Sequence, residues 1–247
     1  MGPLKGIKVL EFSGIGPGPY CGMLLADMGA DVIRVNRIND KDKQNKFDIH
    51  NRSKRSIVAD LKNPNSINEL LKLISSVDVV FEGFRPGVME KLGLGPDECF
   101  KQNKALVYGR MTGWGQDGPM SKMAGHDINY IGLSGALHAI GKKDSNPTIP
   151  LNLIGDYGGG GMMLAMGILA AVISSMKTGK GQVIDSAMID GSLSLMSFFY
   201  SLKQVGFWQD ERESNFLDGA AHFYNTYQCS DNKYLAVGSL EPQFYSI

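Results

Sequence analysis

The chain has 247 residues, of which 43% are hydrophobic, and its 25 basic and 25 acidic residues give a formal net charge of zero. This length and composition allow a sizeable core in one or two domains, and the neutral charge argues against general nucleic-acid binding. Three cysteines, Cys21, Cys99 and Cys229, are too few and too scattered for a disulfide framework or a zinc site, so a reducing compartment fits best.

Strand and helix patterns alternate through the first half of the sequence. Short runs rich in β-branched residues are separated by helical patterns, which predicts a mostly parallel sheet wrapped by helices with right-handed crossovers. The fold class is therefore α/β, with a doubly wound, Rossmann-like large domain. The expected strands cover residues 6–12, 31–35, 56–61, 77–81 and 105–110, and the helices between them cover residues 20–28 and 66–74.

Beyond about residue 150, long helical patterns dominate, over 160–175 and 186–204, with a turn and strand over 178–185 between them. Strand-like segments follow at 221–227 and 234–237. These changes divide the chain into a large domain (1–185), a linker helix and loop (186–220) and the start of a small domain (221–247). The most apolar stretch, 162–176, is shorter than the ~20 residues that span a bilayer, so we expect a core helix and no membrane span. The N-terminus shows no signal peptide.

A glycine-rich loop follows the first strand and resembles a dinucleotide-binding turn. Gly14, Gly16 and Gly18 alternate with other residues, whereas the dinucleotide fingerprint places a third glycine three residues after the second. Pro19 occupies that position. The loop is therefore interpreted as a tight turn between strand and helix.

Asp156 precedes a run of four glycines and an apolar helix pattern. Glycines at the start of a helix leave main-chain N–H groups open to a ligand, and a helix N-terminus favours negative charge. Asp156 is thus either a helix cap or an acid/base carboxylate beside an oxyanion-stabilising helix end.

His126 lies in the segment Gly-His-Asp-Ile-Asn-Tyr and is either a structural or a catalytic histidine. His50, in a charged loop over 36–51, and His138, near a glycine-rich turn, are expected to face solvent. His222 fits a core position equally well.

Four other charged residues are candidates by position. Glu241 stands in a turn-like segment, and Arg37, Lys62 and Arg85 each stand near the end of a predicted strand, where doubly wound folds bind ligands.

Seven ordered blocks along the whole chain resemble the family III CoA-transferase and racemase superfamily, and within it the racemase branch. The blocks are residues 10–13 with 17–19, 26–30, 84–88, 93–96, 125–130, 178–182 and 241–245. The resemblance implies an interlocked homodimer whose active site lies between the large domain of one chain and the small domain of the other.

The resemblance also implies a reaction and roles for residues. The reaction is interconversion of (R)- and (S)-2-methylacyl-CoA by transfer of the α-proton through an enolate, with coenzyme A as part of the substrate and no metal or other cofactor. His126, backed by Glu241, is then the base on one face of the substrate, and Asp156 the base on the other. Arg85 is a candidate for the nucleotide phosphates. The other residues implied to hold CoA and the thioester are Arg37, Ala59, Asp60, Leu61, Lys62, Gly125, Asp127, Ile128, Asn129 and Tyr130.

Two alternatives remain at this point. Family III CoA-transferases use an aspartate at the position of Asp156 as a nucleophile, but the histidine segment is the racemase pattern. Full-length members look longer than this chain, which stops a few residues past Glu241, so an inactive truncated form with exposed apolar surface is the other alternative. Members of this kind work in peroxisomes and mitochondria, and no targeting signal is visible here.

Overall fold

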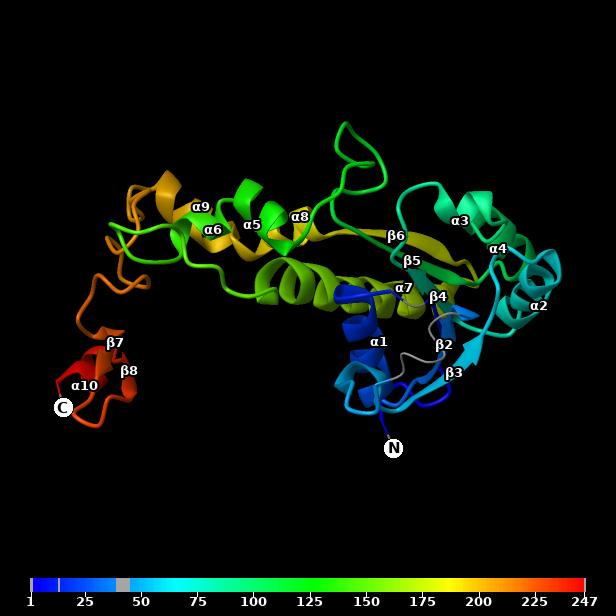
Figure 1. Cartoon of the computed structure of the whole chain (residues 1–247), viewed down its shortest axis with the longest axis horizontal. Coiled ribbons are helices and arrows are strands. Elements are labelled where there is room, and N and C mark those ends of the chain that lie inside the picture. The colour runs from blue at the N-terminus through cyan, green and yellow to red at the C-terminus, as the bar shows by residue number, and fades with distance from the viewer. Residues whose placement is uncertain (1, 13, 39–44, 247) are drawn as a thin grey trace.

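A computed structural model describes residues 2–12, 14–38 and 45–246. Ser13, in the glycine-rich loop, and residues 39–44, in the charged loop, lie outside the described residues. Six parallel strands form one sheet in the order β3-β2-β1-β4-β5-β6, which confirms the predicted doubly wound α/β class (Figure 1). The strands are β1 (Lys8–Phe12), β2 (Asp31–Asn36), β3 (Lys54–Val58), β4 (Val79–Glu82), β5 (Val107–Thr112) and β6 (Gln182–Ala187).

Helices cover both faces of the sheet. Successive residues of a strand point to opposite faces, so Val9 of β1 belongs to one buried cluster and Leu10 to the other. The first cluster includes residues of α1 and α7, and the second includes residues of α2, α3 and α4. Both faces are apolar because both are covered. The first-half helices are α1 (Pro17–Asp27), α2 (Pro64–Ile74), α3 (Val88–Lys91), α4 (Pro96–Gln102), α5 (Asp127–Leu133) and α6 (Ala136–Ala139), with a short 3-10 turn, η2 (Ile49–Asn51).

The central helix is longer than the sequence predicted. A π-helical segment, η3 (Leu153–Met162), runs without a break into α7 (Met163–Thr178), whereas the helix was expected to start at residue 160. The resulting 26 residues, 153–178, are long and apolar enough to cross a membrane by length and composition. Leu164 and Ile168 are fully buried in the first cluster beside Val107 of β5, so this helix packs on the sheet as a core helix.

The predicted helix over 186–204 is divided in the structure. Residues 186–187 complete β6, and the rest forms α8 (Met188–Leu195) and α9 (Ser197–Gln204), joined at Met196. Apolar side chains are exposed along this part of the molecule, as the resemblance to longer proteins had led us to expect. They include Met162, Met166, Ile173 and Met176 of the central helix and Phe198, Val205 and Phe207 of α9 and the following loop.

The last residues form a separate small unit at one end of the molecule, in the red part of the chain (Figure 1). It consists of the antiparallel hairpin β7 (Tyr224–Gln228) and β8 (Tyr234–Gly238) and the short helix α10 (Pro242–Tyr245). The strand-like patterns over 221–227 and 234–237 are thereby confirmed as strands. The domain boundaries after residues 185 and 220 stay predictions.

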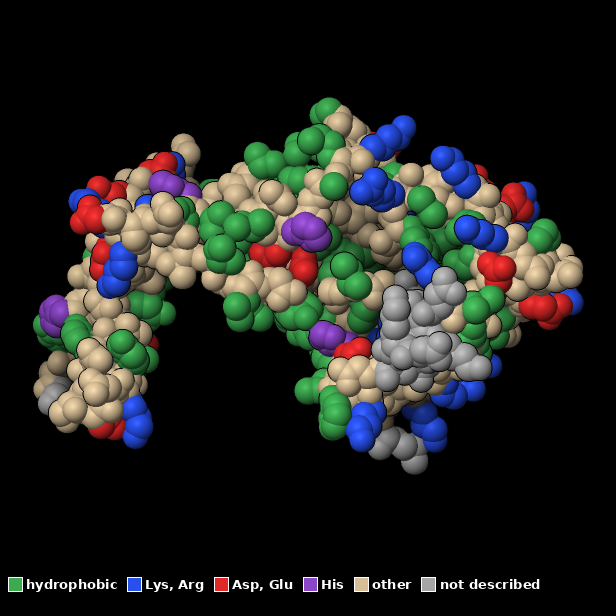
Figure 2. Space-filling model, in the orientation of Figure 1, with side chains coloured by type: hydrophobic (Ala, Val, Ile, Leu, Met, Phe, Trp, Pro, Cys, Tyr) green, Lys and Arg blue, Asp and Glu red, His purple; other side chains and the backbone are tan. Residues whose placement is uncertain are grey.

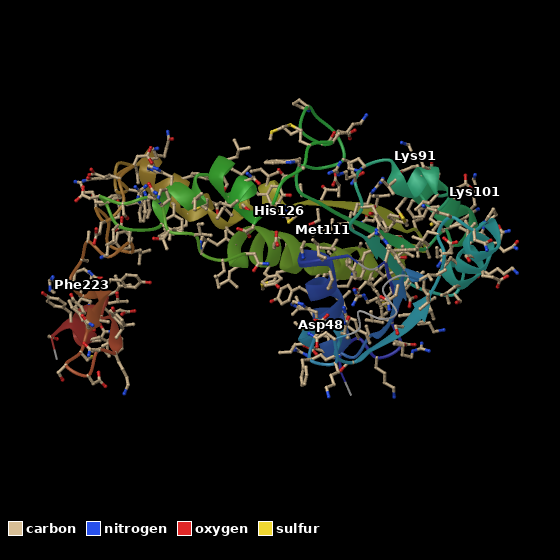
Figure 3. All side chains as sticks on the ribbon, viewed as in Figure 1. Asp48, Lys91, Lys101, Met111, His126 and Phe223 are labelled. Carbon is tan, nitrogen blue, oxygen red and sulfur yellow. The ribbon has the colours of Figure 1, made fainter. Side chains whose placement is uncertain are left out.

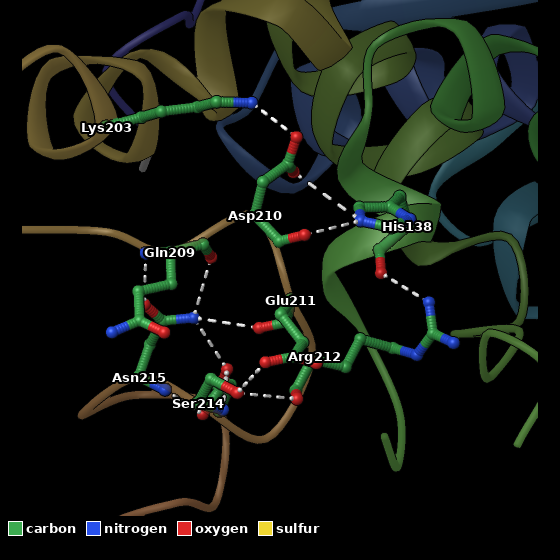
Figure 4. Close-up of polar contacts among 9 residues, drawn as sticks. His138, Lys203, Gln209, Asp210, Glu211, Arg212, Ser214 and Asn215 are labelled. Atoms are coloured by element: carbon green, nitrogen blue, oxygen red, sulfur yellow. Dashed lines mark hydrogen bonds and ion pairs between the residues drawn. The ribbon is translucent and has the colours of Figure 1, made fainter. Parts of the chain in front are cut away.

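A polar junction anchors the segment that leads to this unit. The Arg212 guanidinium donates hydrogen bonds to the carbonyl oxygens of His138 (3.0 Å), Lys142 (3.1 Å) and Ser145 (2.8 Å). Figure 4 shows Arg212 and Asp210 reaching across to His138, while Lys203 pairs with Asp210. The linker is therefore tied to the loop that follows α6.

Candidate active site

A cavity of about 1730 Å³ lies along the edge of the sheet where the strands end. Its lining includes the last residues of three strands, Phe12, Asn36 and Thr112, and the residues just after two others, Gly83 and Met188. Doubly wound folds bind ligands at this edge. The volume exceeds the 300–1,000 Å³ that is typical for compact small-molecule pockets, so a long ligand fits it.

His126 stands at the start of α5, where the chain enters the helix from the loop after β5. Its main-chain N–H donates to Oδ1 of Asn129 (2.9 Å), which fixes the residue at the N-cap position. The side chain is exposed and lines the cavity (Figure 3). An exposed imidazole on a fixed backbone position is suited to proton transfer with a bound ligand.

Asp156 lies in the first turn of η3 and is half-buried in the wall of the same cavity. Nδ2 of Asn152 donates to its Oδ2 (3.2 Å), and its main-chain N–H donates to Oδ2 of Asp127 (2.7 Å). The β1–α1 turn touches its other side: Gly16 has φ 65, and a Cβ there would lie 3.0 Å from Oδ2 of Asp156. Glycine therefore suits this turn both for its backbone conformation and for the close approach of the carboxylate.

The electrostatic surroundings favour a protonated Asp156 more than water does. Burial raises the pKa of Asp156 and the charge of Asp127 raises it further, while the Asn152 hydrogen bond and the charge of His126 lower it. Burial, with the charges of Asp156 and Asp127, also raises the pKa of the nearby Tyr130 to about 12. His126 and Asp156 thus face one cavity, and the charge of His126 acts on the Asp156 carboxyl. In Figure 2 histidine and acidic side chains lie together near the centre of this face.

The four glycines after Asp156 have a different role from the one predicted. They lie within the helix that starts at Leu153, so their N–H groups do not form a free helix end. A Cβ at Gly160 would lie 3.0 Å from Cβ of Pro17, and a Cβ at Gly161 would lie 2.7 Å from the carbonyl oxygen of Pro17. The run lets η3 and α1 approach closely, and the expectation of an oxyanion site made by these glycines was wrong.

The structure brings only part of the predicted CoA-contact residues to the cavity. Arg37 and Arg85 line it, as do Gly125, His126 and Tyr130, and the Arg37 guanidinium lies 5.6 Å from the centre of the Phe84 ring. Ile128 and Asn129, in α5, and the buried Asp127 are not part of its lining. The segment Ala59, Asp60, Leu61 and Lys62 also lies outside this lining. It directly follows β3, which pairs with β2, so it lies at the same edge of the sheet as the cavity.

Glu241 lies far from His126 within the chain. It precedes α10 in the small C-terminal unit, is exposed and is not part of the cavity lining. Figure 3 labels Phe223, of the same unit, at the opposite end of the molecule from the sheet and well away from His126. One chain alone therefore does not form the predicted His126–Glu241 pair.

Sequence reasoning missed the aromatic side chains beside Asp156. The Tyr157 ring lies 4.7 Å from that of Tyr20 and 5.6 Å from that of His50, measured between centroids. The His50 side chain is 31% exposed there, so it faces solvent only in part, whereas His138 is 54% exposed, as predicted. His222 is exposed, and its Nε2 lies 3.0 Å from the hydroxyl of Tyr245.

A buried ion pair beneath the cavity was also missed. Nζ of Lys54 lies 2.6 Å from Oε2 of Glu11, and both side chains are buried. Burial raises the pKa of Glu11 and lowers that of Lys54, and each charge opposes the shift of the other. Further basic side chains of the cavity lining are Arg34, Lys46, Arg52 and Arg55. Arg34 and Lys54 pair with Glu11, Arg52 with Asp27 and Arg55 with Asp31. Among the described residues, the lining cations without a carboxylate partner are therefore Lys46, Arg37 and Arg85, and on this basic side of the cavity they suit an anionic group.

Among the described residues, no group of three or more His, Cys, Asp or Glu side chains is placed to hold a metal ion.

Comparison with known proteins gives consistent results. The sequence profile of CoA-transferase family III matches residues 4–246. Proteins from Mus musculus and Homo sapiens, both named alpha-methylacyl-CoA racemase, are each 47% identical to this chain in alignments that cover 99% of it. The chain spans 63% of the length of each of these relatives. A crystal structure of a CAIB/BAIF family protein from Brucella suis superposes with a TM-score of 0.83 at 30% identity, covering 94% of this chain and 65% of that one.

Proposed function

The chain belongs to CoA-transferase family III, and we propose that it interconverts the (R) and (S) forms of 2-methylacyl-CoA thioesters, with His126 and Asp156 as its two bases. One observation carries the proposal: the two residues come from separate segments, line one cavity and interact electrostatically. The identity to proteins named alpha-methylacyl-CoA racemase supports the choice of reaction.

The chemistry needs a base and an acid on opposite faces of one carbon. A proton α to a thioester is weakly acidic, so a nearby base must remove it while the enolate is stabilised. Return of a proton to the other face inverts the centre. A carboxylate whose pKa is raised by burial accepts and returns a proton more readily than an exposed aspartate, which suits Asp156 to either direction. No group outside the substrate and these residues is needed in the proposed step.

The CoA part of the substrate is proposed to lie along the basic side of the cavity. Arg37 and Arg85 are there to contact phosphates, and the segment Ala59, Asp60, Leu61 and Lys62 is proposed to hold the adenosine end beyond β3. Gly125 and the α5 segment Asp127, Ile128, Asn129 and Tyr130 are proposed to hold the thioester.

A second copy of the chain is proposed to supply Glu241. Since Glu241 lies far from His126 of its own chain, the pair requires a homodimer in which the small unit of one chain reaches the cavity of the other. The exposed apolar side chains of the central helix and α9 offer a surface for such a partner. A location in peroxisomes or mitochondria is proposed from the family alone.

The proposal is tested by incubation with (R)-2-methylacyl-CoA in deuterium oxide, following both α-deuterium uptake and chirality. Wild type should do both. His126→Ala and Asp156→Asn should each reduce racemisation by at least about 10²-fold, because an acid/base group contributes about 10²–10⁴-fold. Each variant should still exchange the α-proton of the enantiomer whose α-proton points towards the remaining base. Asp97→Asn, at an exposed position in α4 outside the cavity lining, serves as the control.

Three results would contradict the assignment. Racemisation that survives both active-site substitutions would exclude these residues as the bases. Transfer of CoA to a free carboxylic acid, without exchange, would instead identify a CoA-transferase with Asp156 as its nucleophile. Folded wild-type protein with neither activity would indicate an inactive form.

A further inference from the structure

The Asp127 carboxylate is buried against the backbone of the helix that carries Asp156. It is 5% exposed, and its Oδ2 accepts the main-chain N–H of Asp156 at 2.7 Å, across 29 residues of sequence. A Cβ at Gly155 would lie 2.8 Å from the same Oδ2, so only glycine leaves room for this contact. The N–H groups in the first turn of a helix have no acceptor within the helix, and Asp127 satisfies one of them from another element.

We propose that Asp127 is a positioning residue for Asp156, holding it opposite His126 by its main-chain N–H and placing a second negative charge beside its carboxylate. Asp127 directly follows His126, so one peptide unit connects the first base to the group that fixes the second. The inference rests on the proposed function for its role in catalysis.

A second feature of Asp127 separates this role from simple helix capping. Its Oδ1 is buried and has no hydrogen-bond partner among the described residues. A capping role needs one acceptor oxygen, which a neutral amide also supplies. A buried carboxylate oxygen without a partner costs free energy, so capping alone does not account for this oxygen. The charge of Asp127 does act on Asp156, raising its pKa.

The other charged or titratable groups around Asp156 can be named. His126 and Tyr130 face it from the segment of α5, and Tyr20 of α1 and His50 of η2 lie next to its neighbour Tyr157. On the remaining elements packed against this helix, Asp190 of α8 is exposed and Asp185 of β6 accepts the N–H of Gln116. Arg110 of β5 is held by Glu82 and Glu90. Asp127 is therefore the carboxylate that acts on Asp156.

The test is Asp127→Asn, which keeps an acceptor for the N–H and removes the charge. The pKa of Asp156 is measured directly by carbon NMR of protein labelled at the aspartate carboxyls, with Asp156→Asn identifying the signal. Removal of a neighbouring negative charge should lower the pKa of Asp156. In the direction of reaction in which Asp156 is the base, the acid limb of the pH profile of kcat/KM should move to lower pH by the same amount. Asp97→Asn, an acid in the first turn of α4, is the matched control and should leave both unchanged.

Each outcome decides the inference. An Asp156 pKa that is the same in wild type and Asp127→Asn overturns it, even when the wild type racemises. A lowered pKa supports it even in a protein without racemase activity, because the NMR measurement does not depend on turnover. Asp127→Ser, which is smaller and also keeps an acceptor, provides the same comparison if the asparagine variant does not fold.

Discussion

Glu82, at the end of β4, is a buried carboxylate that holds the turn leading to Arg85. Its Oε2 accepts the N–H of Phe84 (2.6 Å), and its Oε1 lies 3.2 Å from Nε of Arg110, whose other nitrogens bind Glu90. Burial raises the pKa of Glu82 to about 7, outweighing the lowering effects of the Phe84 N–H and of Arg110. One titrating side chain thus lies directly beneath a cavity-lining turn.

Glu82 should make the protein less stable as the pH rises towards neutrality. A pKa raised by folding contributes stability that is complete below the unfolded value, near 4.5, and is lost as the pH rises through about 7. At about 1.4 kcal/mol per pH unit, the loss amounts to roughly 3 kcal/mol. Glu82→Gln should remove this pH dependence between pH 5 and 8, as measured by urea unfolding. Glu98→Gln, at an exposed i,i+3 pair, is the control, and an unchanged slope in Glu82→Gln would contradict the prediction.

Residue types and spacing singled out His126 and Asp156 as candidates, while their role as bases was implied by the resemblance and stays a prediction. His126 and Asp156 were identified from short motifs, and the structure places both in one cavity. Asn152 and Asp127 contact Asp156 through hydrogen bonds that depend on how η3 and α5 pack, which no local pattern encodes. Glu241 was paired with His126 by resemblance alone, and its distance within the chain could not be read from sequence.

At the scale of elements, α8 packs on the helix that carries Asp156 at two glycines. A Cβ at Gly191 would lie 1.8 Å from the carbonyl oxygen of Gly159 and 2.6 Å from its Cα. These neighbours are backbone atoms, which cannot move aside as the end of a flexible side chain can. The two helices therefore touch through their main chains, and this contact sets the depth of η3 beneath the cavity.

Gly191→Ala should therefore separate α8 from η3 and destabilise the protein by at least about 1–3 kcal/mol, the usual cost of overpacking. Gly132→Ala is the matched control, because Gly132 also lies in a helix and a Cβ there meets nothing within 4 Å. Alanine should stabilise that site by up to about 1 kcal/mol. Urea midpoints of the two variants measure the difference, and equal effects would exclude the close contact.

The positions and approximate limits of the strands along the chain could be predicted, because apolar alternation and glycines at turns are local signals. The start of the central helix could not. Each glycine is about 1 kcal/mol less favourable than alanine inside a helix, so the run 158–161 indicated a break before residue 160. Packing of these glycines against α1 and α8 opposes that preference, and it is visible only in three dimensions.

At the scale of the whole molecule, the sheet domain and the small C-terminal unit are connected through a linker that polar contacts hold at one junction. Arg212 donates to the carbonyl oxygen of His138 in α6 (Figure 4) and to two carbonyl oxygens of the loop that follows. Lys143 contributes an exposed ion pair with Glu211 across the same junction. Exposed ion pairs contribute little, while hydrogen bonds from a charged donor contribute more. Glu213 adds a second contact, because it pairs with Lys142 and accepts the main-chain N–H of Lys143 (3.1 Å). The linker that leads to the unit carrying Glu241 is therefore held by Arg212 together with Glu213.

Arg212→Ala should free the linker without unfolding the sheet domain. Loss of three hydrogen bonds, each of about 1 kcal/mol, should raise amide hydrogen exchange in residues 138–145 and 209–215 by on the order of 100-fold. Exchange in β1 and β4 should stay as in wild type, because their amides lie in the sheet core. Lys143→Ala, which removes only the exposed pair, should change exchange at the junction little. Equal protection in both variants would show that the linker is held by other contacts.

Where a second copy uses Glu241, Arg212→Ala should also lower the rate of racemisation. Exchange of the α-proton by Asp156 should stay intact, because Asp156 lies in the sheet domain.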